Sequence, residues 1–360
     1  MIANLVGNSF NGVFANYAEP QEIVIGTFGN ATNNIHGRIY TLKNQANFFR
    51  GYIPQFMWGF SGDSFSVLRA PVIADLNNDG TNEVLFGAAN KTFAVNNDGT
   101  ERWHIELPLA RNYITQDSYS MFILGVAVSD LDLNGSKEII FSDYSAVGFN
   151  DTWFPSVYIY HEIAGSPVEY CKIRLPGSNQ QRGAVDLSLA DLNKDGKQEI
   201  IVPTKYELFV YDSNCQMVWN VTKGIIANGV AIADIDRDNS VDLVFNTIGY
   251  NCLLEYDLTN GTNGTNGSAS FVNCRNATYV YNASGTLKFQ SNETKYPWTT
   301  PALGNVDDDV ALEAVYGTTD NFAEPIEASD PQSGYISLTV RLTKLIMRLC
   351  QIPILSILAL

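Results

Sequence analysis

Apolar and polar positions follow one another along the chain in short blocks that repeat. Five segments share one order: a short apolar strand, a small residue, a polar acidic loop, an acid and a second apolar strand. They are APVIADLNNDGTNEVLFGA from Ala70, GVAVSDLDLNGSKEIIFSD from Gly125, VDLSLADLNKDGKQEIIVPT from Val185, GVAIADIDRDNSVDLVFNT from Gly229 and PALGNVDDDVALEAVYGT from Pro301. A sixth copy, EIVIGTF from Glu22, has lost the acids of its loop. This self-similarity predicts a repeat architecture.

A second pattern, strand–turn–strand, recurs between the loops. KTFAVNNDGTERWHIEL from Lys91 carries Asp98-Gly99 at its turn, and the segments from Glu207 and Thr278 repeat it, with a weaker copy from Gly37. Each repeat therefore supplies about four antiparallel strands, which is the content of a propeller blade. The predicted fold is all-β, a β-propeller of four-stranded blades, six or seven in number, with the first and last blades incomplete.

The repeats assign residues 1–335 to the propeller. An Asn/Gly/Thr-rich stretch near 257–294 is expected to be a flexible insertion on one propeller face. Residues 336–360 form an apolar tail outside the pattern. After Arg348 only 12 residues remain, roughly 18 Å as a helix and short of the roughly 30 Å hydrocarbon core of a membrane. A last blade segment is favoured for the tail, with a membrane anchor as the alternative.

The acidic loops carry oxygen-bearing side chains at alternate positions. Counting from the first acidic or amide residue, side-chain oxygens stand at positions 1, 3, 5 and 9, and the backbone carbonyl of position 7 can point inward. Calcium binds six to eight oxygen ligands at about 2.3–2.6 Å, so these positions can converge on one ion. A residue that accepts positive φ is expected at position 6, where Gly80 stands in the first loop.

The proposed calcium ligands are the same positions of all five loops. In chain order they are Asp75, Asn77, Asp79, Thr81 and Glu83; Asp130, Asp132, Asn134, Ser136 and Glu138; Asp191, Asn193, Asp195, Lys197 and Glu199; Asp234, Asp236, Asp238, Ser240 and Asp242; and Asn305, Asp307, Asp309, Ala311 and Glu313. The fourth loop has four carboxylates and is expected to bind most tightly. The fifth has Val310 at position 6 and is expected to be weak, because a β-branched residue resists positive φ.

Charge supports this interpretation. The formal net charge is −16, and the ligand positions of the five loops hold the same number of carboxylates. The acidity argues against nucleic acid as a partner, since phosphate binding needs basic surfaces. The alternative is that the loops are solvated polar turns.

Five cysteines and eleven N-x-S/T sequons bear on the compartment. Cys171–Cys215 and Cys252–Cys274 are the predicted disulfides, and free buried thiols are the alternative. The sequons favour export, although an Asn- and Thr-rich chain also produces them by chance. The expected location is extracellular or at the cell surface, with membrane contact only through the tail.

The acidic loops with their closing acids, Phe86-Gly87-Ala88 after one strand and Ala70-Pro71 before a loop resemble the FG-GAP (VCBS) repeats of integrin α-subunit propellers and microbial surface proteins. The resemblance covers roughly residues 10 to 320. It implies calcium sites that brace the blades, and adhesion to a protein or glycan ligand on a propeller face.

The alternative function is that of a polysaccharide lyase or glycosidase on a calcium-binding propeller. It needs a pair of carboxylates outside the loops, for which Asp63, Asp117 and Asp143 are candidates that spacing does not distinguish. The chain has no GxSxG, HExxH, P-loop or GxGxxG motif. Its three histidines are scattered, and its tryptophans are expected to lie mostly in the core. A recognition module is therefore favoured over an enzyme.

Overall fold

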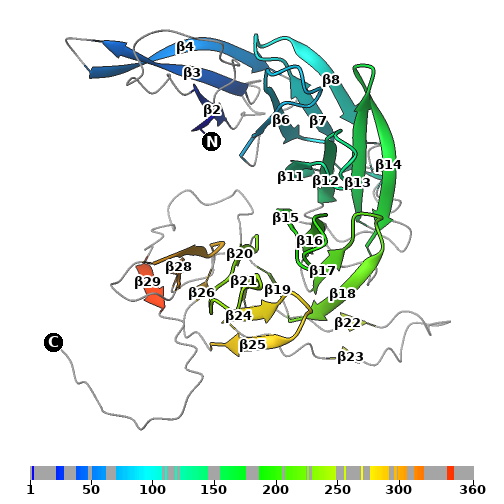
Figure 1. Cartoon of the computed structure of the whole chain (residues 1–360), viewed down its shortest axis with the longest axis vertical. Helices are drawn as coiled ribbons and strands as arrows, with labels where there is room; N and C mark the ends of the chain where they lie inside the picture. The colour runs from blue at the N-terminus through cyan, green and yellow to red at the C-terminus, as the bar shows by residue number, and fades with distance from the viewer. Residues whose placement is uncertain are drawn as a thin grey trace.

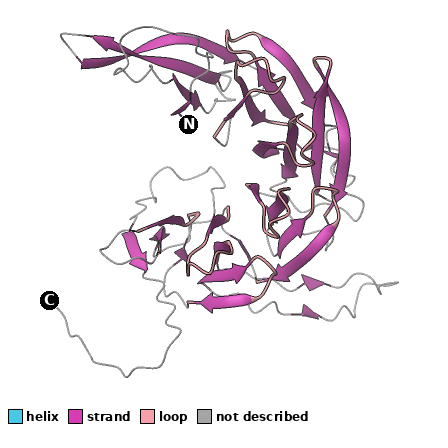
Figure 2. Ribbon diagram, in the orientation of Figure 1, coloured by secondary structure: helices cyan, strands magenta, loops and turns pink. Residues whose placement is uncertain are grey.

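In the computed structural model the described residues are 22–27, 38–47, 51–61, 70–107, 122–144, 155–175, 186–204, 207–223, 229–248, 276–291, 299–305 and 312–319. Short pieces at 2–3, 110–111, 118–119, 225–226, 255–256, 269–270, 296–297 and 339–343 complete them. All of the regular structure in this part of the chain is β-strand (Figure 2). Its strands form six antiparallel sheets and two isolated strand pairs. The prediction of an all-β fold is confirmed.

The first three sheets each contain four strands in chain order. The first holds β1 (Ile2–Ala3), β2 (Glu22–Gly26), β3 (Arg38–Asn47) and β4 (Gly51–Ser61). The second holds β5 (Val72–Ala74), β6 (Glu83–Ala88), β7 (Lys91–Val95) and β8 (Glu101–Glu106). The third holds β11 (Phe122–Ser129), β12 (Glu138–Tyr144), β13 (Ser156–Ile163) and β14 (Ser166–Arg174).

The remaining sheets follow the same plan. The fourth holds β15 (Ser188–Ala190), β16 (Glu199–Pro203), β17 (Glu207–Tyr211) and β18 (Met217–Thr222). The fifth holds β19 (Ile225–Ile226), β20 (Ala231–Ala233), β21 (Asp242–Ile248), β24 (Ala277–Asn282) and β25 (Leu287–Gln290). The sixth holds β26 (Tyr296–Pro297), β27 (Ala302–Gly304), β28 (Glu313–Thr319) and β29 (Thr339–Thr343). The isolated pairs are β9 (Ala110–Arg111) with β10 (Ser118–Tyr119), and β22 (Glu255–Tyr256) with β23 (Ala269–Ser270).

The fifth sheet has four strand positions although it contains five strands. Strands β19 and β20 both pair with β21, β20 through Asp242–Val244 and β19 through Thr247 and Ile248. Strand β24 pairs with β21 along residues that overlap both of them, so it occupies the opposite edge. Strands β19 and β20 are therefore two pieces of one innermost strand.

The sheets follow one another along an arc, and β11 and β15, the first strands of the third and fourth sheets, lie on its concave side (Figure 1). Five buried apolar clusters hold neighbouring sheets together, and each draws its residues from two consecutive sheets. Strand β12 shows how this works, because Ile139 packs towards the second sheet and Ile140 towards the fourth. This face-to-face packing of successive four-stranded sheets is the arrangement of β-propeller blades. The blade number stays a prediction, as does closure of the ring.

Burial explains why the sequence pattern changes across each sheet. All residues of β6, β16 and β21 are buried, because a second strand is covered on both faces. Such strands appear in the sequence as continuous apolar runs. The outer strand β8 alternates between exposed and buried positions instead, as expected for a strand with one covered face.

Two segments that the sequence set apart contribute strands. Part of the predicted tail, Thr339–Thr343, pairs as β29 with β28 of the sixth sheet. Most of the predicted insertion near 257–294 lies outside the described residues, but its C-terminal part supplies β24 and β25. No helix in the described parts of the chain is long and apolar enough to cross a membrane.

Candidate metal centre

The acidic loops join the first and second strands of consecutive sheets. The first four connect β5 to β6, β11 to β12, β15 to β16 and β20 to β21, and all of their residues are described. The fifth connects β27 to β28. Its Asn305 and Glu313 are described, but Asp307, Asp309 and Ala311 lie outside the described residues. The predicted weakness of the fifth site therefore stays a prediction.

The carboxylate at position 1 closes each loop on itself. In the second loop, Asp130 Oδ1 accepts a hydrogen bond from the Asn134 N–H at 3.0 Å, and Asp130 Oδ2 accepts one from the Gly135 N–H at 2.9 Å. The same pair of bonds recurs in the first and third loops. In the fourth loop the bond from Asn239 to Asp234 Oδ2 is present, at 2.9 Å. Position 1 therefore organises the loop backbone.

Positive φ angles confirm the expected turn and add a second one. Position 6 is in the left-handed region in all four loops: Gly80, Gly135, Gly196 and Asn239 have φ of 85°, 89°, 90° and 64°. Position 4 is left-handed too, at Asn78, Leu133, Lys194 and Arg237. Leucine, lysine and arginine rarely adopt this conformation, so the loop hydrogen bonds must hold them there. This second turn was not predicted from the sequence.

Two features hold each described loop in place: a buried apolar residue at position 2 and the closing acid at position 9. Position 2 is buried in each of the four loops whose residues are all described, as Leu76, Leu131, Leu192 or Ile235. The N–H of this residue donates to one oxygen of the position-9 acid, for example Leu131 to Glu138 Oε2 at 2.6 Å. The closing acid therefore ties the start of the loop to the next strand with one of its two oxygens.

The other oxygen of the closing acid has a different partner in each loop. Glu83 Oε1 lies 3.8 Å from the Arg102 guanidinium. Glu199 Oε1 accepts a hydrogen bond from the Asn193 amide at 2.9 Å. Asp242 Oδ1 lies 2.7 Å from the Lys288 amine. Glu138 Oε1 is buried and has no hydrogen-bond partner in the structure. A buried carboxylate oxygen without a partner costs free energy. The fourth loop also has buried oxygens without a hydrogen-bond partner, Asp234 Oδ1, Asp236 Oδ1 and Asp242 Oδ1, but a lysine amine lies at ion-pair distance from two of these carboxylates. The described structure places no such amine among the carboxylates of the second loop, so this loop is the one that most needs an added cation.

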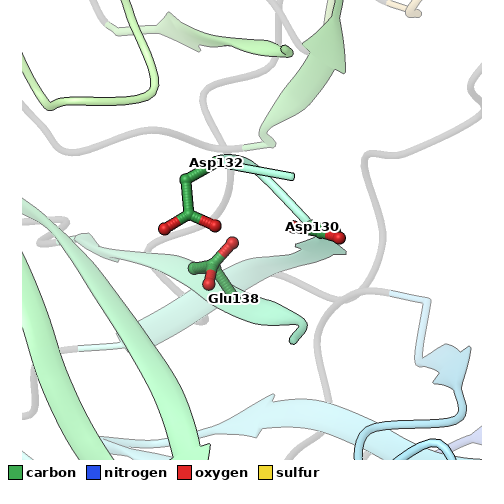
Figure 3. Close-up of side chains that lie close together, drawn as sticks. All are labelled: Asp130, Asp132 and Glu138. Atoms are coloured by element: carbon green, nitrogen blue, oxygen red, sulfur yellow. The ribbon is translucent and has the colours of Figure 1, made fainter. Parts of the chain in front are cut away.

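The second loop also has the geometry of a cation site. Carboxylate oxygens of Asp130, Asp132 and Glu138 lie within 4.8 Å of one another. Figure 3 shows the carboxylates of Asp132 and Glu138 facing each other, with Asp130 at the end of β11. Burial raises the pKa of Glu138 to about 7, and the charges of Asp132 and Asp130 add to the rise. An all-oxygen donor set of this charge fits calcium.

The fourth loop differs from the prediction that it binds calcium most tightly. Its Asp234, Asp236 and Asp242 also bring carboxylate oxygens within 4.8 Å of one another. The amine of Lys288, from β25, lies among these carboxylates, 2.8 Å from Asp236 Oδ2 and 2.7 Å from Asp242 Oδ1. Burial opposes the charge of Lys288, but the hydrogen bonds to the carboxylates outweigh it and raise the pKa of the amine. The loop with the most carboxylates thus has a cation from the chain itself.

The first and third loops are intermediate. In both, the position-3 residue is an asparagine whose amide donates to the position-5 aspartate, Asn77 to Asp79 at 2.8 Å and Asn193 to Asp195 at 3.2 Å. Arg102 lies close to the first loop, but its main partner is Glu162 of the third sheet, to which Nε donates at 2.7 Å. Neither loop brings three carboxylates as close together as the second and fourth loops do among the described residues, so their predicted ligand sets stay predictions. The inward direction of the position-7 carbonyls stays a prediction.

Consecutive loops touch one another through position 4. The Asn78 amide of the first loop donates to the Gly135 carbonyl of the second at 2.7 Å. A Cβ added at Gly196 of the third loop would lie 3.4 Å from the side chain of Leu133 in the second. The charge of Lys194 in the third loop helps to lower the pKa of Asp238 in the fourth, after the hydrogen bonds from Lys288 and Ser240. The loops therefore form a row along one side of the arc.

In the second, third and fifth sheets, one residue of the outer strand interacts with the acidic loop of its own sheet. The sequence did not identify these residues. The last strand of each of the first five sheets pairs with its neighbour through a β-bulge. The extra residues are Met57, Arg102, Tyr170, Val218 and Lys288. Besides Arg102 and Lys288, Tyr170 also interacts with its loop. Burial first, and then the charges of Asp132 and Glu138, raise the pKa of the Tyr170 phenol. A bulge re-aims a side chain in this way.

The residue after the bulge contacts the next sheet. Trp58 donates its indole N–H to the Asn97 carbonyl at 2.7 Å, and Trp219 donates to the Ala283 carbonyl at 3.0 Å, both at the hairpin turn of the following sheet. Trp103 donates to Glu162 of the third sheet. These tryptophans were predicted to be mostly core, and their indole N–H groups show that they also join blades.

A disulfide occupies the equivalent position between the third and fourth sheets. Cys171 follows the bulge of β14 and is bonded to Cys215, in the turn between β17 and β18. The predicted Cys171–Cys215 bond is therefore confirmed. Cys252 and Cys274, the other predicted pair, lie outside the described residues.

The carboxylates considered for catalysis do not form a pair in the described structure. Asp63 and Asp117 lie outside the described residues. Asp143 has no solvent-exposed surface, and it accepts hydrogen bonds from the Ser156 N–H at 2.6 Å and the Tyr158 hydroxyl at 3.2 Å. Burial raises its pKa to about 7. This position suits a structural carboxyl better than one that meets a substrate.

Comparison with solved structures shows that the fold is known. The chain is similar to the V. cholerae biofilm matrix protein Bap1, with a TM-score of 0.50 and 19% identity over 89% of this chain and 44% of that one. It is also similar to the Bacillus licheniformis rhamnogalacturonan lyase PL11, with a TM-score of 0.50 and 12% identity over 84% of this chain and 57% of that one. The chain spans about half of the length of these two proteins.

No protein-family model matches the sequence, and no curated protein sequence matches it. At such low identity the structural similarities establish the fold alone.

Proposed function

We propose that this chain is a calcium-braced β-propeller of the FG-GAP (VCBS) type, which works outside the cell as a recognition or adhesion module. In this proposal the propeller has six or seven blades. Calcium braces it at the acidic loops, and one propeller face meets a protein or glycan ligand. The repeat of the loops and their shared hydrogen-bond scheme support the resemblance to this family.

One observation carries the calcium proposal: Glu138 Oε1 is buried without a hydrogen-bond partner beside two further carboxylates. Asp130, Asp132, Asn134, Glu138 and the carbonyl of Ser136 would hold the ion. When bound, calcium supplies the positive charge that neutralises these carboxylates. The protein residues themselves orient the site, because Asp130 and Glu138 already bind the loop backbone. In this proposal the first and third loops also bind calcium, through the ligands predicted from the sequence.

The extracellular location is supported by the Cys171–Cys215 bond, because disulfides persist mainly in oxidising compartments. The recognition role rests on the family resemblance, with the fold shared with the biofilm matrix protein Bap1 as a precedent. The ligand face stays unassigned.

A binding screen tests the proposal. The purified chain would be applied to glycan arrays and to immobilised extracellular-matrix proteins, once in calcium and once in excess chelator. We expect at least one ligand class to be retained in calcium and released by chelation. Retention of no ligand in calcium, or equal retention in chelator, would contradict the role of a calcium-dependent recognition module.

The fold shared with a rhamnogalacturonan lyase favours one second candidate, a polysaccharide lyase. Incubation of the chain with rhamnogalacturonan and other acidic polysaccharides would test it. A lyase forms a double bond in the product by elimination, and the absorbance of that unsaturated product reports the reaction directly. Absence of this product under calcium-replete conditions would leave the recognition module as the function.

A further inference from the structure

The β-bulge of the fifth sheet directs Lys288 to the fourth acidic loop. Strands β24 and β25 pair Val280 with Phe289 and Tyr281 with Leu287, so Lys288 is the extra residue between them. Its side chain is only 16% exposed. The lysine therefore reaches the loop from an outer strand, far from Asp242 in the sequence.

The contacts of the amine match its chemistry. The Lys288 Nζ lies 2.8 Å from Asp236 Oδ2, 3.0 Å from Asp238 Oδ2 and 2.7 Å from Asp242 Oδ1. An ammonium group has three N–H donors and no acceptor, so it suits a position among three carboxylates. Asp238 Oδ2 accepts a hydrogen bond from the amine, and Asp236 and Asp242 are its ion-pair partners. They are also the carboxylates at positions 3, 5 and 9 of the loop, the ones assigned to calcium from the sequence.

The equivalent residues of the neighbouring sheets do not take this role. Arg102 of the second sheet makes its bidentate ion pair with Glu162 of the third. Tyr170 of the third sheet and Val218 of the fourth carry no positive charge. Among the described sheets with an acidic loop, the fifth is thus the one whose bulge residue places a cation among its own loop carboxylates.

We propose that Lys288 is the resident cation of the fourth loop, so that this loop keeps its conformation without a metal ion. The fifth blade is then independent of calcium, while the second loop, whose carboxylates have no such amine among them in the described structure, depends on it. Calcium removal consequently loosens the middle of the propeller and leaves the fifth blade intact. The inference extends the proposed calcium binding of the other loops, but it makes a separate claim about the chain's own lysine.

Counting bound calcium ions by equilibrium dialysis and metal analysis tests the inference. We expect Lys288→Gln to bind one calcium ion more per chain than the unaltered protein. Without the lysine amine, the carboxylates of the fourth loop have no cation and can bind calcium instead. Lys223→Gln is the matched control: that amine lies over the Tyr279 ring, 5.5 Å from its centroid, and away from the loop. Its calcium count should stay unchanged. Adding Asp236→Asn to Lys288→Gln should abolish the extra ion.

Equal calcium counts for Lys288→Gln and the unaltered protein would overturn the inference. If the unaltered protein binds no calcium but Lys288→Gln binds one ion, the proposed calcium bracing fails and the role of Lys288 stands. The two claims are therefore distinguishable.

Hydrogen exchange on the unaltered protein tests the inference without any variant. Chelation should leave the amides of residues 234–242 as protected as before, while those of residues 130–138 exchange faster. In chelator, Lys288→Gln should speed exchange in residues 234–242 about 100-fold, the equivalent of the roughly 3 kcal/mol lost when a buried charge pair is broken. Loss of protection at 234–242 in the chelated unaltered protein would contradict the inference.

Discussion

Replacing Glu138 by glutamine should have opposite effects with and without calcium. Glutamine has nearly the same shape and can still accept the hydrogen bond from the Leu131 N–H that Glu138 Oε2 now accepts at 2.6 Å. It removes the negative charge that is buried beside Asp130 and Asp132. Without calcium, this buried charge only destabilises the folded protein. With calcium, the carboxylate that carries it binds the ion.

The size of the effect follows from the pKa of Glu138, which burial and the neighbouring carboxylates raise from 4.5 to about 7. At about 1.4 kcal/mol per pKa unit, ionisation of this carboxyl in the folded protein costs on the order of 3 kcal/mol. A pKa raised by folding means that the contribution of this group to stability is complete at pH below about 4.5 and is lost as the pH rises through about 7. Without calcium, the unaltered protein should therefore lose stability between about pH 5 and pH 8.

Urea denaturation of both proteins in chelator and in excess calcium would measure the difference. In chelator at pH 8 we expect Glu138→Gln to be the more stable protein, by up to about 3 kcal/mol, and to lack the pH-dependent loss. In calcium it should be the less stable one, because ligand binding at a thousand times Kd adds about 4.1 kcal/mol only where the site is intact, which exceeds the advantage of the variant in chelator. Glu101→Gln, an exposed glutamate paired with His104, is the control and should change neither value. If Glu138→Gln destabilises the protein equally in both conditions, the interpretation of Glu138 as a calcium ligand is wrong.

Three further predictions concern other parts of the fold. Asp143→Asn should raise stability at pH 8, raise it less at pH 5 and leave it nearly unchanged below about pH 4 in pH-dependent melts, because burial raises the pKa of Asp143 from 3.8 to about 7 and its ionised form is the costly one; a larger loss at pH 8 than at pH 5 would contradict this. Cys171→Ser, which breaks the bond to Cys215 across 44 residues of chain, should lower the free energy of unfolding by about 4 kcal/mol in non-reducing urea titrations; an unchanged value would show that the bond does not constrain the unfolded chain. Asn134, a sequon residue at position 5 of the second loop, should be unmodified in glycopeptide maps of the secreted protein, and an occupied Asn134 would exclude it as a ligand.

The repeat pattern predicted the strand content and the loop chemistry for clear physical reasons. Second strands such as Glu83–Ala88 are buried on both faces, so they appear as apolar runs that end at a polar loop. Glycine at position 6 reports a positive φ, which Gly80, Gly135 and Gly196 confirm. Both signals come from residues that are close together in the sequence, so they can be recognised without a structure.

The partners of the loops could not be predicted in the same way. Lys288 belongs to the fourth loop only because a β-bulge in β25 turns its side chain towards Asp242, 46 residues earlier in the chain. A weak signal was present, since Arg102 and Lys288 both stand three residues after a turn glycine, Gly99 or Gly285. Counting carboxylates alone ranked the fourth site highest and took no account of a cation from another strand, so this ranking stays a prediction.

The contacts between blades could not be predicted for a related reason, because they also join residues that are far apart in the sequence. Trp58 and Trp219 look like core residues in the sequence, yet each packs over the turn glycine of the next sheet. A Cβ at Gly99 or Gly285 would lie 2.9 Å or 2.8 Å from the indole ring. Glycine is therefore required there both by its positive φ and by the approach of the tryptophan. The hydrophobic pattern predicts that these residues are buried, but it does not say which sheet covers them.

A crystal structure determined in excess calcium, with anomalous diffraction to locate the ions, tests the central claim most directly. We predict a calcium ion in the second loop, with oxygens of Asp130, Asp132 and Glu138 at about 2.3–2.6 Å, and the Lys288 amine still among the carboxylates of the fourth loop. A calcium-replete crystal without an ion at any acidic loop would contradict the account.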